Sequence, residues 1–196
     1  KKIKKELLVK PFVPKCIQQI PSEPFPIYRE SSSKIYLPRF YGINTFGDPK
    51  NYKILNNEKI SLNFQGQLRD YQLNIANKYI NHVSDKGGAL LEMDTGMGKT
   101  VLALYILSKL NVKTIILVHK EFLLNQWVER IQEFLPSAKI GRIQGKKLEI
   151  DNCQIVMGMI QSISTKDYSN DLFKTFGFTI IDEVHHMGAE VFSNAL

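Results

Sequence analysis

Two patterns of hydrophobic and polar positions alternate along the chain from about residue 62 to residue 183. Apolar side chains at helical spacing predict three helices, RDYQLNIANKYINHV (69–83), TVLALYILSKL (100–110) and EFLLNQWVERIQEFL (121–135). Short apolar runs predict strands at KGGALLEM (86–93), KTIILVH (113–119), 139–143, QIVMGM (154–159) and FTIIDE (178–183). Because strands that are buried on both faces read as continuous apolar runs, the alternation predicts an α/β domain with a mostly parallel sheet covered on both sides.

The first 60 residues follow a different pattern. They hold seven of the eight prolines, which argues against long helices. Two β-prone runs, Phe25–Glu30 and Lys34–Phe40, flank a serine-rich connection and predict a hairpin, and residues 41–50 (YGINTFGDPK) read as turns and linker. We therefore expect a small, β-rich, basic accessory domain over residues 1–60 and a second domain over residues 61–196. The aromatic residues expected in the small core of the first domain are Phe25, Tyr28, Tyr36, Phe40 and Tyr41.

Charge divides the chain in the same place. Residues 1–60 carry twelve Lys or Arg against five Asp or Glu, so the whole net charge of +7 lies there, and the rest of the chain balances at fourteen of each sign. Such asymmetry favours a polyanionic partner such as nucleic acid. The short KKIKK run at the start is better explained by itself as a solvated tail.

Composition argues against several classes of protein. No apolar run approaches the roughly 20 residues that a membrane-spanning helix needs, and the first residues lack the apolar core of a secretory signal. Cys16 and Cys153 lie far apart without a Cys/His cluster, so neither a disulfide framework nor a zinc site is indicated. We expect an intracellular protein with free thiols and no membrane partner, in the cytoplasm or nucleus, or in the host cytoplasm if the protein is viral.

The turn MDTGMGKT (93–100) lies between a predicted strand and a predicted helix, as a phosphate-binding loop requires. Gly96 and Gly98 permit successive backbone N–H groups to point inward, and the helix adds the positive end of its dipole. In this interpretation Lys99 reaches the β- and γ-phosphates of ATP and Thr100 binds Mg²⁺ through its hydroxyl. The full G-x-x-x-x-G-K-[ST] pattern asks for glycine where this chain has Met93, so the motif is suggestive only when taken alone.

A second motif, TIIDEVHH (179–186), places two adjacent acids at the end of an apolar strand. Open α/β sheets bind ligands at this carboxyl edge. Asp182 is suited to hold Mg²⁺, and Glu183 is suited to orient or deprotonate the attacking water. The alternative, in which an acidic strand end only caps a helix, is weaker once both motifs are present.

MDTGMGKT followed by DEVH resembles motifs I and II of the DExH-box superfamily 2 helicases, whose ATPase core is a pair of RecA-like domains. Four further blocks follow in the order of that family. LRDYQ (68–72) resembles the Q-motif, ILVHKEFLLNQWVERI (116–131) motif Ia, GRIQGKK (141–147) motif Ib, and IVMGMIQSI (155–163) the next nucleic-acid-contacting block. The resemblance covers about residues 62–196 and is strongest to the branch with repair and transcription helicases, phage recombination helicases and helicases of large DNA viruses.

The resemblance implies roles for individual residues. Gln72 would read the edge of the adenine, Arg69 would pack near the base, and His185 would couple the ATP state to the nucleic-acid side. The phosphate cradle would also include Thr95 and Met97. Nucleic-acid contacts are implied at the ends of three strands, at His119, Lys120, Gly145, Gln161 and Ser162.

Three positions depart from the pattern of the family. His119 stands where many relatives have proline, and Met159 stands where many have threonine, so the backbone contacts of these two blocks are not carried over. Met93 replaces a small residue at a position that contributes packing more than phosphate contact. Trp127 lies on the apolar face of its predicted helix and reads as a core residue, not as a platform for stacking bases.

These observations predict an ATP-dependent DNA helicase or translocase that uses ATP and Mg²⁺. Motif III and the second RecA-like domain, with its arginine finger, do not occur in residues 1–196, so we expect this chain alone to bind nucleotide weakly and to hydrolyse it poorly. Residues 1–60 are expected to grip duplex nucleic acid. Two other functions stay open: a nucleic-acid-binding or scaffolding module with an inactive RecA-like half, and a P-loop ATPase acting on a different substrate. The sequence does not decide between DNA and RNA, or between unwinding and translocation.

Overall fold

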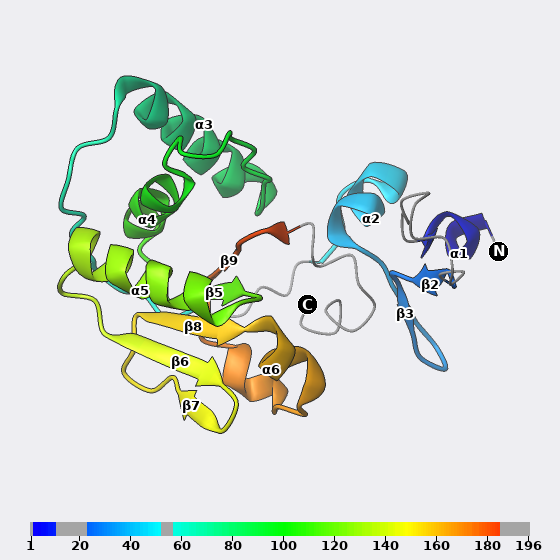
Figure 1. Cartoon of the computed structure of the whole chain (residues 1–196). Helices are drawn as coiled ribbons and strands as arrows, with labels where there is room; N and C mark the ends of the chain where they lie inside the picture. The colour runs from blue at the N-terminus through cyan, green and yellow to red at the C-terminus, as the bar shows by residue number, and fades with distance from the viewer. Residues whose placement is uncertain (1, 11–22, 52–56, 185–196) are drawn as a thin grey trace, which may run out of the picture. The chain divides into compact units, whose positions relative to one another are not determined.

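The computed structural model describes residues 2–10, 23–51 and 57–184, which belong to two compact units (Figure 1). The boundary between the units falls between Ile54 and Leu55. The smaller unit contains the described residues up to 51, and the larger unit contains residues 57–184.

The described residues of the smaller unit form two pairs of very short strands and two helices. α1 spans Lys2–Glu6, and β1 (Leu8–Val9) pairs antiparallel with β2 (Phe25–Pro26). β3 (Arg29–Glu30) pairs antiparallel with β4 (Ile35–Tyr36), and the N–H of Ser31 closes the turn by donating to the carbonyl of Lys34 at 2.8 Å. The predicted hairpin is therefore confirmed around its serine-rich connection, over 29–36. The outer parts of the two predicted runs differ, because Phe25 and Pro26 pair with β1 and a helix begins at Arg39.

Helix α2 (Arg39–Phe46) shows that the interpretation of residues 41–50 as turns and linker was wrong for residues 41–46, whereas residues 47–50 form neither helix nor strand. The helix begins directly after Pro38 and ends at Gly47, whose φ is +81°. Proline is compatible with a helix start because its missing N–H would have no partner there, and glycine readily adopts the positive φ that ends a helix. The sequence pattern concealed this helix because glycine and asparagine, both poor helix formers, lie inside it.

The aromatic residues of the smaller unit are only partly buried. Phe25 is buried, but Tyr36 and Phe40 are 55% and 47% exposed, so the expectation that they form the core was wrong for these two. A unit of this size has too little interior to cover all of its large side chains. The hydroxyl of Tyr41 instead donates a hydrogen bond to the Glu6 carboxylate at 2.5 Å, and this bond raises the pKa of Tyr41.

The larger unit contains a five-stranded sheet with the strand order β7-β6-β8-β5-β9 (Figure 1). The four parallel strands are β5 (Thr114–Val118), β6 (Ile140–Gln144), β8 (Ile155–Met159) and β9 (Phe178–Ile181). β7 (Lys147–Glu149) pairs antiparallel with β6 through the tight turn at Gly145, and the sequence pattern did not predict this strand. The mostly parallel sheet predicted from the apolar runs is confirmed.

Helices cover both faces of this sheet. The helices described in the larger unit are α3 (Asp70–Lys86), which packs on α4, α4 (Lys99–Leu110), α5 (Glu121–Phe134), α6 (Ile160–Thr165) and the 3-10 helix η2 (Asn170–Phe173). On one face, α4 and α5 pack against alternate residues of β5, including Ile116 and Val118. On the other face, Ile163 of α6 and Leu117 of β5 meet over Gly158, where a Cβ atom would lie 2.8 Å from both side chains.

Residues 86–93 form no strand, contrary to the prediction from their apolar run. Leu90 is 74% exposed, whereas Leu91 and Met93 pack with Ala76 and Leu102 between α3 and α4. Within residues 57–184, β9 pairs with β5 alone, and no second strand lies beside 86–93. An extended segment needs a neighbouring strand to satisfy its backbone groups, so an apolar run without one does not become a strand.

Candidate nucleotide and nucleic-acid site

The topology directs the predicted phosphate loop and the acid pair toward the same edge of the sheet. β5, β8 and β9 are parallel, so their carboxyl ends share one edge, and Asp182 directly follows β9 there. α4 packs on the sheet and returns to the start of β5 through residues 111–113 only. Because α4 must therefore run opposite to β5, its first residue, Lys99, lies toward the carboxyl edge.

The loop before α4 has the backbone conformation that its glycines permit. Gly96 and Gly98 have φ of +81° and +82°, in the left-handed region that disfavours other residues. Gly98 is also the N-cap of α4, and no side chain caps this helix start. The first N–H groups of the helix and the positive end of its dipole are thus available to an anion at this point.

Lys99, the first residue of α4, is half-buried and folds back over the loop. Its ammonium donates hydrogen bonds to the carbonyl of Met93 at 2.6 Å and to the carbonyl of Asp94 at 3.3 Å. These bonds hold the positive charge inside the turn that would surround a phosphate. Thr100 follows on the first turn of α4, and its hydroxyl makes no hydrogen bond to other residues in the described part of the chain.

The start of α3 is tied to the same loop. The side-chain oxygen of Gln72 accepts the N–H of Arg69 at 3.0 Å, and its amide nitrogen donates to the carbonyl of Met97 at 3.0 Å. The hydroxyl of Tyr71 donates to the same carbonyl at 3.1 Å, and the guanidinium of Arg69 donates to this hydroxyl at 3.3 Å. The structure thus brings Arg69, Gln72 and Met97 together, although the adenine contacts stay a prediction. Tyr71 was missed, and only its place inside the LRDYQ block pointed to it.

Asp182 extends the hydrogen-bond ladder of β9, because its N–H donates to the carbonyl of Leu117 at 3.0 Å. Its carboxylate oxygen Oδ2 accepts the indole N–H of Trp127 at 2.9 Å. Glu183 follows with φ of +55°, a conformation that costs energy for a residue with a side chain and that redirects the chain immediately after the strand. The predicted coupling residue His185 lies outside the described residues.

Three loops predicted to contact nucleic acid are joined at the carboxyl ends of β5, β6 and β8. The side-chain amide of Gln161 donates to the carbonyl of His119 at 2.6 Å, and the N–H of Gly145 donates to the hydroxyl of Ser162 at 2.9 Å. Lys166, which the sequence pattern did not single out, donates to the carbonyl of Gly145. Four predicted residues from three separate blocks therefore share one hydrogen-bonded edge.

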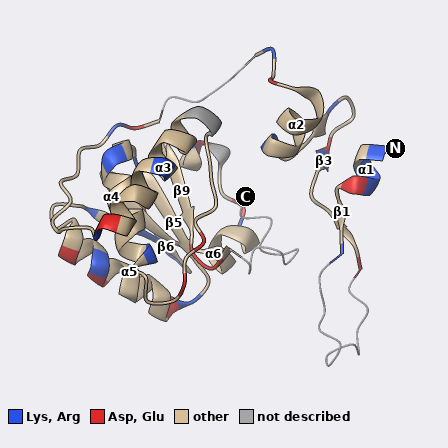
Figure 2. Cartoon of the chain, turned by 90° about the horizontal axis from the view of Figure 1, so that it is seen from above, with Lys and Arg blue, Asp and Glu red and all other residues tan. Residues whose placement is uncertain are grey.

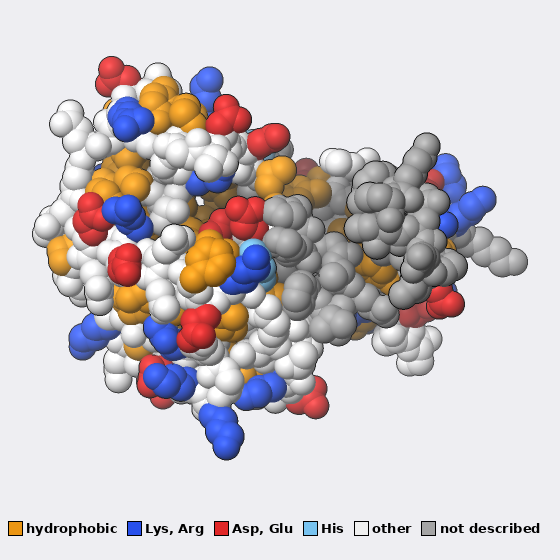
Figure 3. All heavy atoms as spheres, viewed as in Figure 1, with side chains coloured by type: hydrophobic (Ala, Val, Ile, Leu, Met, Phe, Trp, Pro, Cys, Tyr) orange, Lys and Arg blue, Asp and Glu red, His pale blue; other side chains and the backbone are white. Residues whose placement is uncertain are grey.

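Lys120, the fifth residue of the predicted nucleic-acid set, is exposed beside that edge. Its ammonium lies over the ring of Phe122, 5.8 Å from the centroid. Lys and Arg are interspersed with Asp and Glu over the larger unit in both views (Figures 2 and 3). On the face shown in Figure 3, the basic side chains of this unit are scattered and form no continuous positive patch.

The donor set at the edge is compatible with Mg²⁺. In the described residues no three His, Cys, Asp or Glu side chains lie close enough to hold a metal ion by themselves. Magnesium is usually held by one or two protein oxygens, with phosphates and water completing its octahedron. The unbonded hydroxyl of Thr100 and the carboxylate of Asp182 are ligands of that kind, whereas a zinc site would need more nitrogen or sulfur donors.

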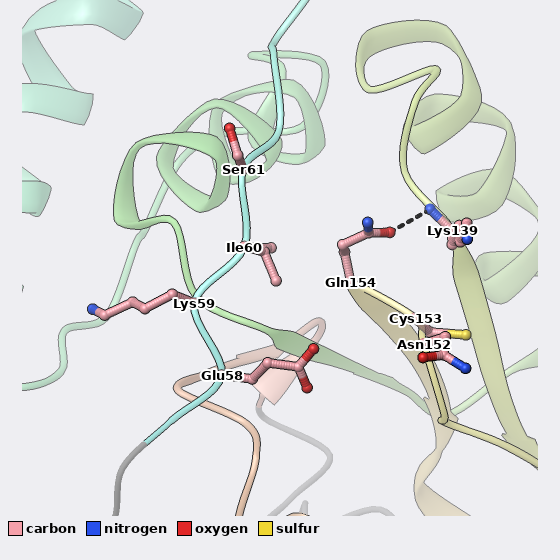
Figure 4. A pocket seen from close by; sticks show the side chains of 8 residues that line it. All are labelled: Glu58, Lys59, Ile60, Ser61, Lys139, Asn152, Cys153 and Gln154. Atoms are coloured by element: carbon pink, nitrogen blue, oxygen red, sulfur yellow. Dashed lines mark hydrogen bonds between the residues drawn. The ribbon is translucent and has the colours of Figure 1, made fainter.

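A separate hollow of about 360 Å³ opens at the opposite end of the strands (Figure 4). It is lined by residues 58–61, which run beside the residues that lead into β5, and by residues just before β6 and β8: Glu58, Lys59, Ile60, Ser61, Lys139, Asn152, Cys153 and Gln154. On one side of the hollow, the side chain of Gln154 accepts the N–H of Lys139 at 2.7 Å (Figure 4). None of the predicted site residues lines it. Cys153 is a free thiol, as predicted, and Cys16 lies outside the described residues.

The chain matches a family model described as type III restriction enzyme, res subunit, over residues 65–196. The "Putative ATP-dependent RNA helicase L396" of Acanthamoeba polyphaga mimivirus is 38% identical over 98% of this chain and 38% of its own length. The "Putative helicase 109L" of Invertebrate iridescent virus 3 is 31% identical over 82% of this chain and 52% of its own length. The chain thus spans between about two fifths and one half of these relatives.

Among solved structures, the Sulfolobus solfataricus SWI2/SNF2 ATPase core in complex with dsDNA superposes with a TM-score of 0.57 at 16% identity. The match covers 73% of this chain and 31% of that chain. This likeness supports a RecA-like fold for the larger unit. No helix in the described residues is long and apolar enough to cross a membrane.

Proposed function

Because the chain belongs to the family of the type III restriction enzyme res subunit, within the superfamily 2 helicases, we propose that it forms the ATP-binding part of a nucleic-acid motor. One observation carries the proposal. The glycine loop with Lys99, the acid Asp182 and the joined loops at His119, Gly145 and Gln161 all belong to one edge of the sheet. ATP and nucleic acid would therefore occupy neighbouring positions on one rigid element.

In this proposal each residue has a defined role. The loop N–H groups and the start of α4 receive the phosphates, and Lys99 exchanges its two carbonyl partners for β- and γ-phosphate oxygens. Thr100 and Asp182 would hold Mg²⁺, which when bound neutralises the charge on those phosphates. Glu183 would orient the attacking water and accept its proton.

We propose duplex DNA as the substrate. The basic first third of the chain supports a polyanion, and the superposed SWI2/SNF2 core was solved with dsDNA. The name of the mimivirus relative specifies RNA, so matched DNA and RNA duplexes belong in the same experiment. The smaller unit, with its excess of lysine and arginine, would grip the duplex through phosphates.

The test is nucleotide binding by three proteins, followed by duplex binding. A fluorescent ATP analogue is titrated into wild type, Lys99→Ala and the control Lys109→Ala, which removes an exposed lysine from the far end of α4. We expect Lys99→Ala to weaken binding at least ten-fold and Lys109→Ala to leave it unchanged, because only Lys99 lies in the loop. Equal binding by all three proteins would contradict the proposal.

Duplex binding then separates the motor from the alternative ATPase, because this chain alone is expected to hydrolyse ATP poorly. We expect wild type loaded with a non-hydrolysable ATP analogue to bind duplex DNA more tightly than duplex RNA of the same sequence. Tighter binding of RNA would identify RNA as the substrate. Binding of ATP without binding of either duplex would favour a P-loop ATPase acting on another substrate.

A further inference from the structure

Trp127 is the only tryptophan of the chain, and its indole N–H is directed at the end of β9. The residue lies in the middle of α5, is 4% exposed, and packs with Leu124 and Ile131 of the same helix in the main core cluster. Packing on this scale fixes the plane of the ring. The direction of the N–H, and therefore its hydrogen bond to Asp182, is set by the core.

Packing alone does not account for an indole at this position. A phenylalanine would fill much of the same apolar volume without bringing a polar group that needs a partner. The indole N–H finds that partner in a carboxylate, at 2.9 Å from Oδ2. Hydrogen bonds to an ionised acceptor are roughly twice as strong as bonds between neutral groups. The indole of Trp127 therefore fills space in the core and also restrains the carboxylate of Asp182.

The restraint distinguishes the two oxygens of Asp182. Oδ2 faces α5 and is engaged by the indole, whereas Oδ1 makes no hydrogen bond to any other residue between 57 and 184. The backbone of Asp182 is held as well, by its bond to Leu117. With the backbone and one oxygen fixed, rotation of the carboxylate is limited and the other oxygen keeps one orientation.

We propose that Trp127 is a positioning residue that presents Oδ1 of Asp182 to the magnesium ion of the bound nucleotide. The inference rests on the proposed function, because it gives the restrained carboxylate a ligand. Hydrogen-bonding partners of metal ligands typically change metal affinity by about 10–100-fold. Losing the indole N–H while keeping an aromatic ring should therefore weaken the metal and spare the fold.

The single tryptophan provides a direct readout of the contact. In a ¹H–¹⁵N spectrum of the ¹⁵N-labelled chain, the side-chain N–H of Trp127 gives one indole signal. We expect Asp182→Ala to shift this signal toward the position of an indole without a charged partner. An unchanged indole signal in Asp182→Ala would overturn the inference, and this result does not depend on whether Trp127 variants fold.

Metal affinity is measured next, as the Mg²⁺ concentration that gives half-maximal binding of a fluorescent ATP analogue. We expect Trp127→Phe to raise this concentration about ten-fold. The control, Phe134→Leu, removes aromatic packing from the same helix and cluster without contacting Asp182, and should leave the value unchanged. Thermal unfolding of both variants checks that the loss of packing is comparable.

The outcomes separate the two proposals. Normal Mg²⁺ dependence in Trp127→Phe, with nucleotide still bound through Lys99, would overturn the role of Trp127 and leave the proposed function standing. A similar rise in both Trp127→Phe and Phe134→Leu would also overturn it, because general loosening of the core would explain the effect. Absence of nucleotide binding by wild type would overturn the proposed function first, and the inference with it.

Discussion

Gly96 and Gly98 have almost the same positive φ but different surroundings. A Cβ atom on Gly96 would meet nothing within 4 Å, whereas a Cβ atom on Gly98 would lie 2.5 Å from the side-chain nitrogen of Gln72. Gln72 is 6% exposed and donates to the carbonyl of Met97, so it cannot move away without losing that bond. Gly98 is thus required by its conformation and by its neighbour, and Gly96 by its conformation alone.

Alanine substitutions separate these two requirements. We expect Gly96→Ala to destabilise the chain by about 1–2 kcal/mol, the cost of a left-handed residue with a side chain, and Gly98→Ala to cost more. Combining Gly98→Ala with Gln72→Ala should cost less than the sum of the two single changes, because the clash is removed. Urea unfolding measures all four variants. Equal losses for the two glycine variants would show that the contact with Gln72 is unimportant.

Ser162 offers a second prediction at this scale, because its hydroxyl accepts the N–H of Gly145 and joins two predicted nucleic-acid blocks. Ser162→Ala should weaken duplex binding roughly five-fold, in line with about 1 kcal/mol for one hydrogen bond. Ser164→Ala is the matched control, since its hydroxyl only bonds Gln161 within α6 at 3.4 Å. Filter binding at one fixed salt concentration compares them. A loss as large in Ser164→Ala would contradict the prediction.

At the scale of elements, periodicity in the sequence predicted the helices α3, α4 and α5 and the parallel strands. These elements bury one face or both faces, and burial is what the pattern records. The prediction from periodicity failed for segments whose secondary structure does not depend on burial. Residues 86–93 are apolar but have no neighbouring strand, α2 has little amphipathic spacing, and β7 is an exposed edge strand fixed by the turn at Gly145.

The candidate site was predictable to the same extent. The loop at 93–100 and the acids at 182–183 carry short motifs whose chemistry is local, so their residues could be named from the sequence. The bond between Trp127 and Asp182 joins positions 55 residues apart, and Trp127 was interpreted as core alone. Its apolar periodicity correctly indicated burial, but periodicity contains no information about where an indole N–H points.

Helix α5 gives rise to a prediction of its own. It begins at Glu121, directly after the predicted nucleic-acid residue Lys120, and carries Trp127 less than two turns later, about 10 Å along the axis. Duplex DNA bound at this loop should therefore shift the indole signal of Trp127 in the ¹H–¹⁵N spectrum. The shift should be smaller in Lys120→Ala at the same DNA concentration. A signal that is insensitive to saturating DNA would rule out this connection.

At the scale of the whole molecule, the two units differ in net charge. The excess of lysine and arginine lies in the first 60 residues, whereas residues 61–196 have equal numbers of basic and acidic side chains, which are interspersed on the face shown in Figure 3. If the smaller unit grips phosphates, it should contribute to the salt dependence of binding. The larger unit would then supply ATP chemistry and a few directed contacts, and the smaller unit would supply charge.

Paired substitutions test this division. Lys34→Gln with Arg39→Gln neutralises two exposed charges of the smaller unit, and Lys59→Gln with Lys139→Gln neutralises two charges at the edge of the larger unit away from the site. The first pair should reduce the slope of log affinity against log salt by up to about 1.8, and the second pair should not change it. Identical slopes for both pairs would remove the smaller unit from the interface.

The central claim is that the loop at 94–100 and Asp182 meet at one metal-bound triphosphate. The most direct measurement is paramagnetic broadening of the ¹⁵N-labelled chain by Mn²⁺ bound to a non-hydrolysable ATP analogue. The account predicts that the backbone signals of Thr100 and Asp182 broaden together, while that of Gln154, in the hollow at the opposite end of the strands, stays sharp. Broadening of Thr100 without Asp182, or of Asp182 without Thr100, would contradict it.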